Sequence, residues 1–353
     1  MIRLLHVDSG REWRGGQNQV RLLTRELARD AGVQQRLFTR GGSELAERAG
    51  AHGVAIADTA WGMALDPRAL WRLYRELARD KPDIVHAHEG NALQLAFWAR
   101  RLAGGGPRAP ALVATRRVDF HLHARSVWRR VDHLIAVSAA VQRVLVQDGV
   151  PPRDITVVHD GIDPAEVGRA AHRPSDIRGR LGLAPRTPLA VNVAALVPHK
   201  DHRTLIHAAH AARARRPDLH WVVAGDGELR RRLAAEIARL GLADRVHLLG
   251  YVPDADALIR EADVFVMSSR EEGLGSVVLH AIALGIPVVS TRAGGLPEIV
   301  PEQALAPVGD AAALAQKVIA ALDRPRALPF PPQFTAAAMS RGVLDVYRSF
   351  TLR

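Results

Sequence analysis

The segment DVFVMSSREEGLGSVVLHAIALGIPVVS (residues 263–290) decides the fold class of this chain. Its two ends, 263–269 and 287–290, are short runs rich in β-branched residues and predict strands. Between them, a tight turn at Gly273–Gly275 is followed by a helical pattern of apolar residues over 276–284. Two strands joined by a helix form the crossover unit of a parallel sheet, so the segment predicts an α/β fold.

The same alternation of strands and helices continues in both directions along the chain. In the first half we expect strands at 2–8, 35–38, 83–88, 111–117, 133–138 and 155–161, and helices at 17–30, 67–80, 91–103 and 139–148. In the second half we expect strands at 188–196, 219–225 and 245–250, and helices at 201–215, 228–240, 254–261 and 310–323. The strands are apolar almost throughout, as expected when helices cover both faces of a parallel sheet. This repetition predicts two doubly wound α/β domains.

The length of 353 residues also favours about two domains. Turn-forming residues over 163–187 predict the boundary, and the prolines of 327–334 precede a last helix at 335–350. The expected division is 1–165, 166–330 and a C-terminal helix within 331–353. Ligands of open α/β sheets bind beyond the carboxyl ends of the strands, so functional residues are expected in the loops that follow strands.

The composition excludes several classes of protein. The chain has no cysteine, which excludes disulfides, thiolate zinc sites and cysteine nucleophiles. No apolar run is long enough to span a bilayer, and a cytoplasmic location is expected. Forty-eight basic and 37 acidic residues give a net charge of +11, which favours anionic partners. Only three of the basic residues are lysines: Lys81, Lys200 and Lys317.

The loop after the strand at 263–269 carries the strongest functional pattern. The amides of Gly275, Ser276 and Val277 lie at the start of the predicted helix, where free N–H groups and the helix dipole favour an anion. Glu272 precedes this turn and could accept hydrogen bonds from sugar hydroxyls. The alternative is an ordinary strand-to-helix turn in which the side chain of Ser276 caps the helix.

Together with AIALGIPVVSTRAGGLPEIV (281–300), this loop resembles the signature of retaining GT-B glycosyltransferases of the family 4 group, the glycosyl transferases group 1. That signature has two glutamates with seven residues between them, and here Glu272 takes the first position and His280 the second. In the family the second glutamate typically binds the nucleotide ribose, so His280 is a departure that affects nucleotide binding. The resemblance implies two Rossmann-like domains facing each other across a cleft. The acceptor side would be 1–165 and the donor side 166–330, with the C-terminal helix packing back toward the first domain.

The resemblance also implies the residues that bind the donor. They are Gly15, Gly16, Gly225, Asp226, Tyr251, Val252, Gly273, Leu274, Gly275, Ser276 and His280. Lys200 matches the family lysine that holds the diphosphate, whereas the usual arginine position is occupied by Ala195. The alternative for Lys200 is a solvated surface lysine, and the alternative for Gly225–Gly227 is an ordinary tight turn.

Glu272, Lys200 and Arg116 are the expected catalytic residues. Arg116 lies where many relatives have a histidine near the reacting sugar, and an arginine there could supply the charge that Ala195 lacks. His88 and Arg117 are expected on the acceptor side, with His86 and His88 pointing toward the mouth of the cleft.

Two further patterns have competing explanations. Segment 100–130 holds eight arginines, Arg125 among them, and one acid, with Trp98, Phe120 and Trp128 nearby. It could contact an anionic membrane surface or acceptor, or form a solvated face. Asp254-Ala255-Asp256 superficially resembles a carboxylate metal motif but is interpreted as a helix N-cap, since the resemblance implies no metal and no cofactor.

The expected function is retaining transfer of a sugar from a nucleotide-diphosphate-sugar donor to a hydroxyl of a cell-surface glycan or glycolipid. The pathway would be lipopolysaccharide or exopolysaccharide biosynthesis in the cytoplasm, with peripheral contact to anionic lipid on the inner face of the inner membrane. The alternatives are a GT-B-type sugar-nucleotide epimerase and a catalytically degenerate sugar-nucleotide-binding protein. A nucleic-acid partner is not expected, because no recognised nucleic-acid module occurs and the charge is spread along the chain.

Overall fold

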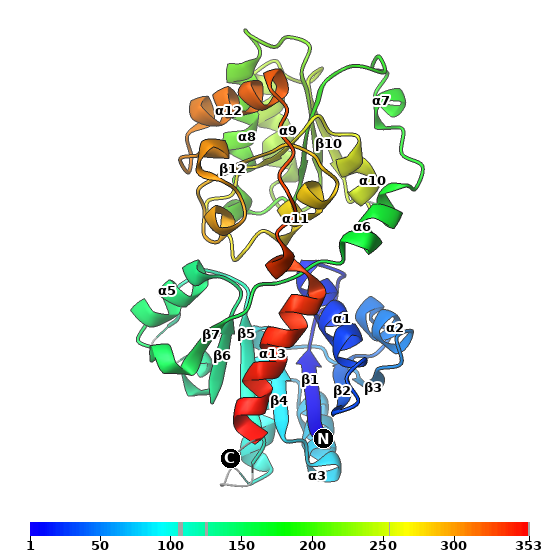
Figure 1. The fold of residues 1–353 in the computed structure, drawn as a ribbon, viewed down its shortest axis with the longest axis vertical. Coiled ribbons are helices and arrows are strands. Elements are labelled where there is room, and N and C mark those ends of the chain that lie inside the picture. The colour runs from blue at the N-terminus through cyan, green and yellow to red at the C-terminus, as the bar shows by residue number, and fades with distance from the viewer. Residues whose placement is uncertain (105–108, 124–125, 254, 352–353) are drawn as a thin grey trace. The chain divides into compact units, whose positions relative to one another are not determined.

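The computed structural model describes residues 1–104, 109–123, 126–253 and 255–351 and divides the chain into two compact units. Unit 1 comprises Met1–Gly161 and the C-terminal segment from Pro332, and unit 2 comprises Ile162–Pro331 (Figure 1). Each unit contains its own parallel sheet, as the α/β repetition predicts.

Unit 1 has a seven-stranded sheet of order β3-β2-β1-β4-β5-β6-β7. Its strands are β1 (Ile2–Asp8), β2 (Val33–Arg40), β3 (Ala55–Thr59), β4 (Ile84–Ala87), β5 (Ala111–Arg116), β6 (His133–Ala136) and β7 (Ile155–Val157). Its helices are α1 (Gly15–Leu27), α2 (Glu44–Gly50), α3 (Pro67–Asp80), α4 (Gly90–Leu102), α5 (Ala139–Gln147) and α13 (Ala336–Thr351). The strand order reverses between β1 and β4, and at such a switch point the loops after the two strands diverge and leave space for a ligand.

Unit 2 has a six-stranded sheet of order β10-β9-β8-β11-β12-β13. Its strands are β8 (Leu189–Val193), β9 (His220–Ala224), β10 (Val246–Gly250), β11 (Val264–Met267), β12 (Val288–Thr291) and β13 (Leu305–Ala306). Its helices are α6 (Pro164–Ala171), α7 (Ile177–Arg180), α8 (His202–Ala212), α9 (Arg230–Arg239), α10 (Ala255–Arg260), α11 (Ser276–Ala283) and α12 (Ala311–Asp323). The order reverses between β8 and β11, so the loops after these neighbouring strands form the switch point of unit 2.

Local signals explain where the helices begin and end. Helix α3, for example, starts at Pro67, and the carboxylate of Asp66 accepts hydrogen bonds from the amides of Arg68 (2.9 Å) and Ala69 (3.4 Å). It ends where Lys81 adopts a left-handed conformation with φ of 42°.

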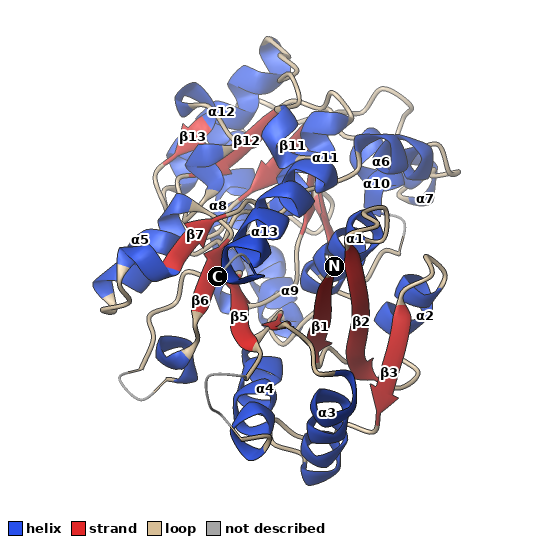
Figure 2. Ribbon diagram, turned by 60° about the horizontal axis from the view of Figure 1, so that its bottom comes forward, coloured by secondary structure: helices blue, strands red, loops and turns tan. Residues whose placement is uncertain are grey.

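The last helix, α13, belongs to unit 1 and confirms that the C-terminal helix returns to the first domain. It lies beside α1 and β1 (Figure 1; Figure 2), and its buried residues Met339, Val343 and Tyr347 share a hydrophobic cluster with Leu4 of β1 and Ile84 of β4. Burial of these apolar side chains holds the C-terminus of the chain to the N-terminal sheet.

Within the described part of the chain, no helix is both long enough and apolar enough to cross a lipid bilayer.

Candidate functional site

The loop between β11 and α11 is folded so tightly that position 275 requires glycine. Gly275 adopts φ of 84°, and a Cβ atom there would lie 2.6 Å from Cδ2 of Leu296 and 3.3 Å from Cγ of Glu272. The backbone N–H of Gly295 donates to the carbonyl of Glu272 at 3.0 Å. Gly275 is the N-cap of α11 and no side chain caps the helix, so the alternative in which Ser276 is the capping residue is wrong.

Glu272 and Lys200 meet at the carboxyl edge of the unit 2 sheet. The Nζ atom of Lys200 donates to Oε2 of Glu272 at 2.5 Å, and Oγ of Ser269 donates to the same oxygen at 3.1 Å. The two side chains are only 18% and 10% exposed, so the ion pair is largely shielded from water. The loops that follow β8 and β11 therefore place an ammonium group and a carboxylate at one point, beside the start of α11. An ammonium group in this position can bind a phosphate, and a carboxylate can accept hydrogen bonds from hydroxyls.

A second ion pair supports the same two loops, and sequence reasoning missed it. Asp201 caps α8 in a left-handed conformation with φ of 44°, and its Oδ2 accepts from Nε of Arg270 at 2.7 Å. The hydroxyl of Ser268 also donates to the carbonyl of Lys200 at 3.0 Å. These bonds tie the loop after β8 to the loop after β11 next to the pair formed by Lys200 and Glu272. The one feature of the sequence that could have indicated this ion pair is Asp201, an acid directly after Lys200.

The glycine turn after β9 packs against the loop that carries Ala195. A Cβ atom on Gly225 would lie 1.9 Å from the carbonyl oxygen of Ala194, so no other residue fits at this position. The amide of Leu196 donates to the carbonyl of Asp226 at 3.0 Å, whereas the Asp226 side chain is exposed. This turn is thus a close backbone contact beside the loop that leads to Lys200.

Tyr251 and Val252 follow β10 and differ in their surroundings. Tyr251 is 64% exposed, and Val252 packs against the cluster that contains Leu258. An exposed aromatic ring at the carboxyl edge of the sheet can stack on a planar ligand. Asp254, which was assigned to a helix cap, lies outside the described residues.

His280 is held by an acid from the neighbouring helix. Its Nδ1 atom lies 2.6 Å from Oδ1 of Asp256 in α10, and the two side chains are 21% and 18% exposed. Asp256 was expected to belong to an N-cap, and its hydrogen bond to His280 was not predicted. The second position of the signature therefore holds a histidine together with a carboxylate.

In unit 1, Gly15 and Gly16 are the first two residues of α1. An added Cβ atom on either would meet no atom within 4 Å, and neither has a positive φ. The fold of the described residues does not require glycine at these two positions. Because Gly15 and Gly16 have no side chain, they leave open space at the start of α1.

Arg116 and Arg117 at the end of β5 are both engaged by neighbours. Arg116 is 9% exposed, its Nη2 donates to the carbonyl of Phe120 at 2.7 Å, and its guanidinium lies 4.9 Å from the ring centre of Trp128. Burial lowers the pKa of Arg116 from its usual value. Arg117 donates to Oδ1 of Asp160 at 3.2 Å and to the backbone carbonyl of His88 at 2.9 Å.

The aromatic residues of the arginine-rich segment do not form one surface. Trp98 and Phe120 are exposed, at 43% and 39%, whereas Trp128 is 7% exposed and packs on Arg116. The expectation that Trp128 belongs to such a contact surface is therefore wrong. Arg125 lies outside the described residues.

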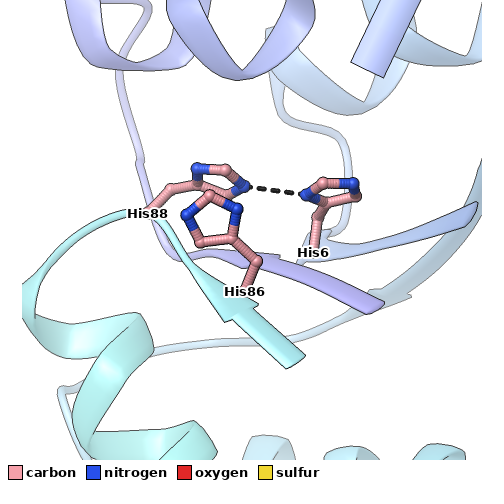
Figure 3. A group of neighbouring side chains, drawn as sticks. All are labelled: His6, His86 and His88. Atoms are coloured by element: carbon pink, nitrogen blue, oxygen red, sulfur yellow. Dashed lines mark hydrogen bonds between the residues drawn. The ribbon is translucent and has the colours of Figure 1, made fainter. Parts of the chain in front are cut away.

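His86 and His88 are buried, so the expectation that they point toward the mouth of a cleft is wrong. His88 and His6 are joined by a hydrogen bond of 3.0 Å between Nε2 and Nδ1 (Figure 3), and the three histidines are 0–3% exposed. His86 uses both ring nitrogens, toward the hydroxyl of Tyr347 at 2.5 Å and that of Thr115 at 2.7 Å.

Burial keeps these three histidines neutral. It lowers the pKa of His6 to about 4 and that of His86 and His88 well below the usual value. His6, His86 and His88 have one nitrogen each within 4.8 Å of the others, the one such grouping of metal-ligand side chains in the described part of the chain. Because both nitrogens of His86 are already hydrogen-bonded, the histidines act here as a buried network that joins β1, β4 and α13.

Comparisons with known proteins cover nearly the whole chain. The model of the Glycosyltransferase Family 4 matches residues 13–166, and the model of the Glycosyl transferases group 1 matches residues 175–338. The lipopolysaccharide core biosynthesis glycosyltransferase LpsE of Rhizobium meliloti is 30% identical over 62% of this chain. The putative colanic acid biosynthesis glycosyltransferase WcaL of Escherichia coli K12 is 32% identical over 68% of this chain. The matched regions span 58% and 61% of the length of these two relatives.

Solved structures show the fold. The Anabaena protein Alr3699/HepE in complex with UDP and glucose superposes with a TM-score of 0.81 at 19% identity, covering 99% of this chain and 100% of that chain. Sucrose-phosphate synthase from Thermosynechococcus elongatus superposes with a TM-score of 0.75 at 20% identity, covering 100% of both chains. The two parallel sheets of this chain thus have the GT-B architecture.

Proposed function

The chain belongs to the glycosyltransferases of group 1 and family 4, and from this premise we propose that it transfers a sugar from a nucleotide-diphosphate-sugar to a hydroxyl of a cell-surface glycan or glycolipid. The proposed reaction retains the configuration at the anomeric carbon and serves lipopolysaccharide or exopolysaccharide biosynthesis. The observation that carries the proposal is the contact between Lys200 and Glu272 beside the start of α11.

In the proposed donor complex, Lys200 exchanges its bond to Glu272 for bonds to the diphosphate. The leaving diphosphate gains negative charge as the bond to the sugar breaks, and a fixed ammonium group with helix amides stabilises that charge. The amides of Gly275, Ser276 and Val277 at the start of α11 supply the second part of this stabilisation. Glu272, released from Lys200, accepts hydrogen bonds from the sugar hydroxyls.

Retention requires the acceptor oxygen to attack the face that the leaving phosphate vacates. The bond between the anomeric carbon and the phosphate oxygen breaks, the bond to the acceptor oxygen forms, and the acceptor proton passes to the departing phosphate oxygen. No protein base, metal or cofactor takes part in the proposed reaction, so dialysis against EDTA is expected to leave the rate unchanged.

For the ribose we propose that Asp256 replaces the missing glutamate. Its carboxylate lies 2.6 Å from His280, at the second position of the signature, and its oxygens can accept hydrogen bonds from ribose hydroxyls. His280 would then orient Asp256 through Nδ1. Gly225, Asp226, Tyr251 and Val252 complete the proposed donor side, with the exposed ring of Tyr251 available to the nucleobase.

UDP-sugars are the first donors to test, because the Anabaena structures with the same fold hold UDP and UDP-glucose. The names of LpsE and WcaL support a lipopolysaccharide or exopolysaccharide acceptor.

We propose that the protein works in the cytoplasm at the inner face of the inner membrane. The basic segment 100–130, with the exposed Trp98 and Phe120, would contact anionic lipid there.

The direct test is transfer from a panel of UDP-, GDP- and ADP-sugars, followed by Glu272→Gln with the best donor. Loss of this carboxylate is expected to reduce transfer about 100-fold or more while the melting temperature stays within a few degrees. Glu271→Gln is the matched control, since this neighbouring acid is exposed and should leave transfer unchanged. An epimerised nucleotide-sugar formed without acceptor, or donor binding with no turnover in the presence of acceptor, would replace the proposal with an alternative function.

A further inference from the structure

A cavity of about 440 Å³ lies at the carboxyl edge of the unit 1 sheet. The loops after β1 and β3, the last residue of β2 and the start of α4 line this open cavity. We call it the arginine pocket because Arg11, Arg14 and Arg40 line it together with Trp61, Met63 and Glu89. Its volume is within the range of sites that bind small molecules, about 300–1,000 Å³. None of the residues predicted from the sequence to bind the acceptor lines this cavity.

Two of the arginines, Arg11 and Arg40, form no ion pair with an acid among the described residues. Arg11 donates through Nη2 to the backbone carbonyl of Gly62. The Nε atom of Arg40 is shielded from solvent and has no hydrogen-bond partner in the described structure. Burial and the nearby charge of Arg11 lower the pKa of Arg40, against an opposing effect of the charge of Asp66, so the two guanidinium groups repel each other.

The acids around the pocket are already occupied by other donors. Glu89 caps α4 and accepts from the hydroxyl of Ser9 and from the amides of Asn91 and Ala92 at 2.5–2.7 Å. Asp66, at the neighbouring start of α3, is likewise used as a cap, and Glu12 is paired with Arg14 at 2.6 Å. Arg11 and Arg40 therefore have no ion pair of their own in this concave site, although the charge of Asp66 offsets part of the charge of Arg40.

One wall of the pocket is apolar: Met63 is exposed there, and the buried Trp61 supports its backbone through a hydrogen bond. Trp61 is 2% exposed, its ring packs edge-on against Phe38 with ring centres 5.8 Å apart, and its indole N–H donates to the carbonyl of Met63 at 3.0 Å. The side chain of Met63 is 66% exposed beside it. A ligand that fits this site has an apolar face next to an anionic group, as a sugar with a phosphate or carboxylate does.

We propose that the arginine pocket binds a negatively charged sugar, with Arg11 and Arg40 as the residues that bind its phosphate or carboxylate group. The proposal rests on the proposed function in one respect: in a sugar transferase, this sugar is the end of the acceptor glycan. Guanidinium groups suit both anions, because their paired N–H donors match two oxygens of a phosphate or carboxylate.

The test measures binding to the full chain in the absence of donor, so it does not depend on transfer. Glucose 6-phosphate, glucuronate, glucose and inorganic phosphate are titrated by calorimetry at low and high salt. The two charged sugars are expected to bind at least tenfold more tightly than glucose, and more weakly as salt rises. Equal binding of glucose and glucose 6-phosphate would overturn the proposal. If inorganic phosphate bound as tightly as glucose 6-phosphate, the sugar would add nothing to binding, and the proposal that the pocket recognises a sugar would be overturned.

Variants then locate the site. Arg40→Gln and Arg11→Gln should each weaken binding of the charged sugar about tenfold or more, and Arg40→Lys, which keeps the charge, should weaken it less. Arg153→Gln is the matched control, since this arginine is 86% exposed and lies outside the pocket. Arg11 is exposed, so Arg11→Gln should fold even if Arg40→Gln does not. If Arg11→Gln kept a normal melting temperature and bound the charged sugar as the unaltered protein does, the assignment of the anion to this pocket would be contradicted.

The outcome can be separated from that of the proposed function. Glu272 lies in unit 2, whereas the arginine pocket lies in unit 1. The variant Glu272→Gln should therefore bind glucose 6-phosphate as the unaltered protein does. Binding of the charged sugar without any transfer would uphold the pocket and remove the transferase proposal. Transfer to neutral acceptors alone, unaffected by Arg11→Gln, would remove the pocket proposal and uphold the transferase.

Discussion

The ammonium group of Lys200 lies 2.5 Å from Oε2 of Glu272, so the two predicted catalytic residues of unit 2 neutralise each other in this structure. They are separated by 72 positions in the sequence and brought together because β8 and β11 are adjacent strands. A donor diphosphate would compete with Glu272 for Lys200. Donor binding and the release of Glu272 are therefore coupled in the proposed mechanism.

Lys200→Met should weaken the binding of UDP by about 10- to 100-fold, because hydrogen bonds to charged groups contribute roughly 1.5–3 kcal/mol. Calorimetric titration with UDP measures this change. The control is Lys317→Met, which removes an exposed lysine that donates to the carbonyl of Gln303. An unchanged affinity in Lys200→Met would mean that Lys200 only pairs with Glu272 and does not hold the diphosphate.

His280→Glu should lower the melting temperature, because the new carboxylate would face Asp256 at the position where His280 now lies 2.6 Å away. The double variant His280→Glu with Asp256→Asn removes that repulsion and places one carboxylate at the second position of the signature. It should recover the melting temperature and bind UDP at least as tightly as the unaltered protein. If the double variant lost UDP binding while His280→Glu kept it, Asp256 would act by its charge at its present position.

Gly225→Ala and Gly16→Ala should separate folding from function. The first places a methyl group 1.9 Å from the carbonyl oxygen of Ala194 and should destabilise unit 2 by about 3 kcal/mol or more. The second meets no atom within 4 Å and should leave the melting temperature unchanged or slightly higher. If the start of α1 approaches the donor closely, Gly16→Ala still lowers transfer. Thermal denaturation and transfer rates of both variants check these outcomes.

The buried histidines should make the protein sensitive to acid. The unfolded chain takes up protons at His6 near pH 6.5, whereas the native protein does so only near pH 4, because burial lowers the pKa. Native stability from His6 is thus fully present above about pH 6.5 and is lost as the pH falls toward 4. The loss approaches about 3 kcal/mol for this residue, at roughly 1.4 kcal/mol per pH unit.

The measurement is the melting temperature between pH 4.5 and 7.5 for the unaltered protein and His6→Asn. The variant should be less stable at pH 7.5 but lose less stability on acidification. Parallel curves for the two proteins would mean that His6 is not the group responsible.

Local patterns predicted most elements well because helices and buried strands carry a periodic signal. Helix α3 was predicted at 67–80, the bounds that it has in the structure, since its apolar residues recur at helical spacing. Asp66 and Pro67, which that prediction did not use, mark its start in the structure. The edge strand β3 (Ala55–Thr59) was missed because only one of its residues is buried, which leaves no apolar run. The strand β13 (Leu305–Ala306) was missed because it has two residues.

His86 and His88 show where local reasoning failed. They are two positions apart in and after β4 and so face the same side of the sheet. That side is covered by α13, whose Tyr347 lies 261 positions from His86 in the sequence. No local pattern indicates which distant helix covers a given face, so their burial could not be predicted.

The sequence by itself determined the two α/β units and placed Glu272 and Lys200 in loops that follow strands, because hydrophobic periodicity and turn residues act over short distances. Tertiary structure alone decided which side chains meet: Lys200 with Glu272, His280 with Asp256, and Arg11 with Arg40 in one pocket. Those contacts depend on strand order and on the packing of loops from distant parts of the chain. The charge around each functional group is set by neighbours that no nearby stretch of sequence identifies.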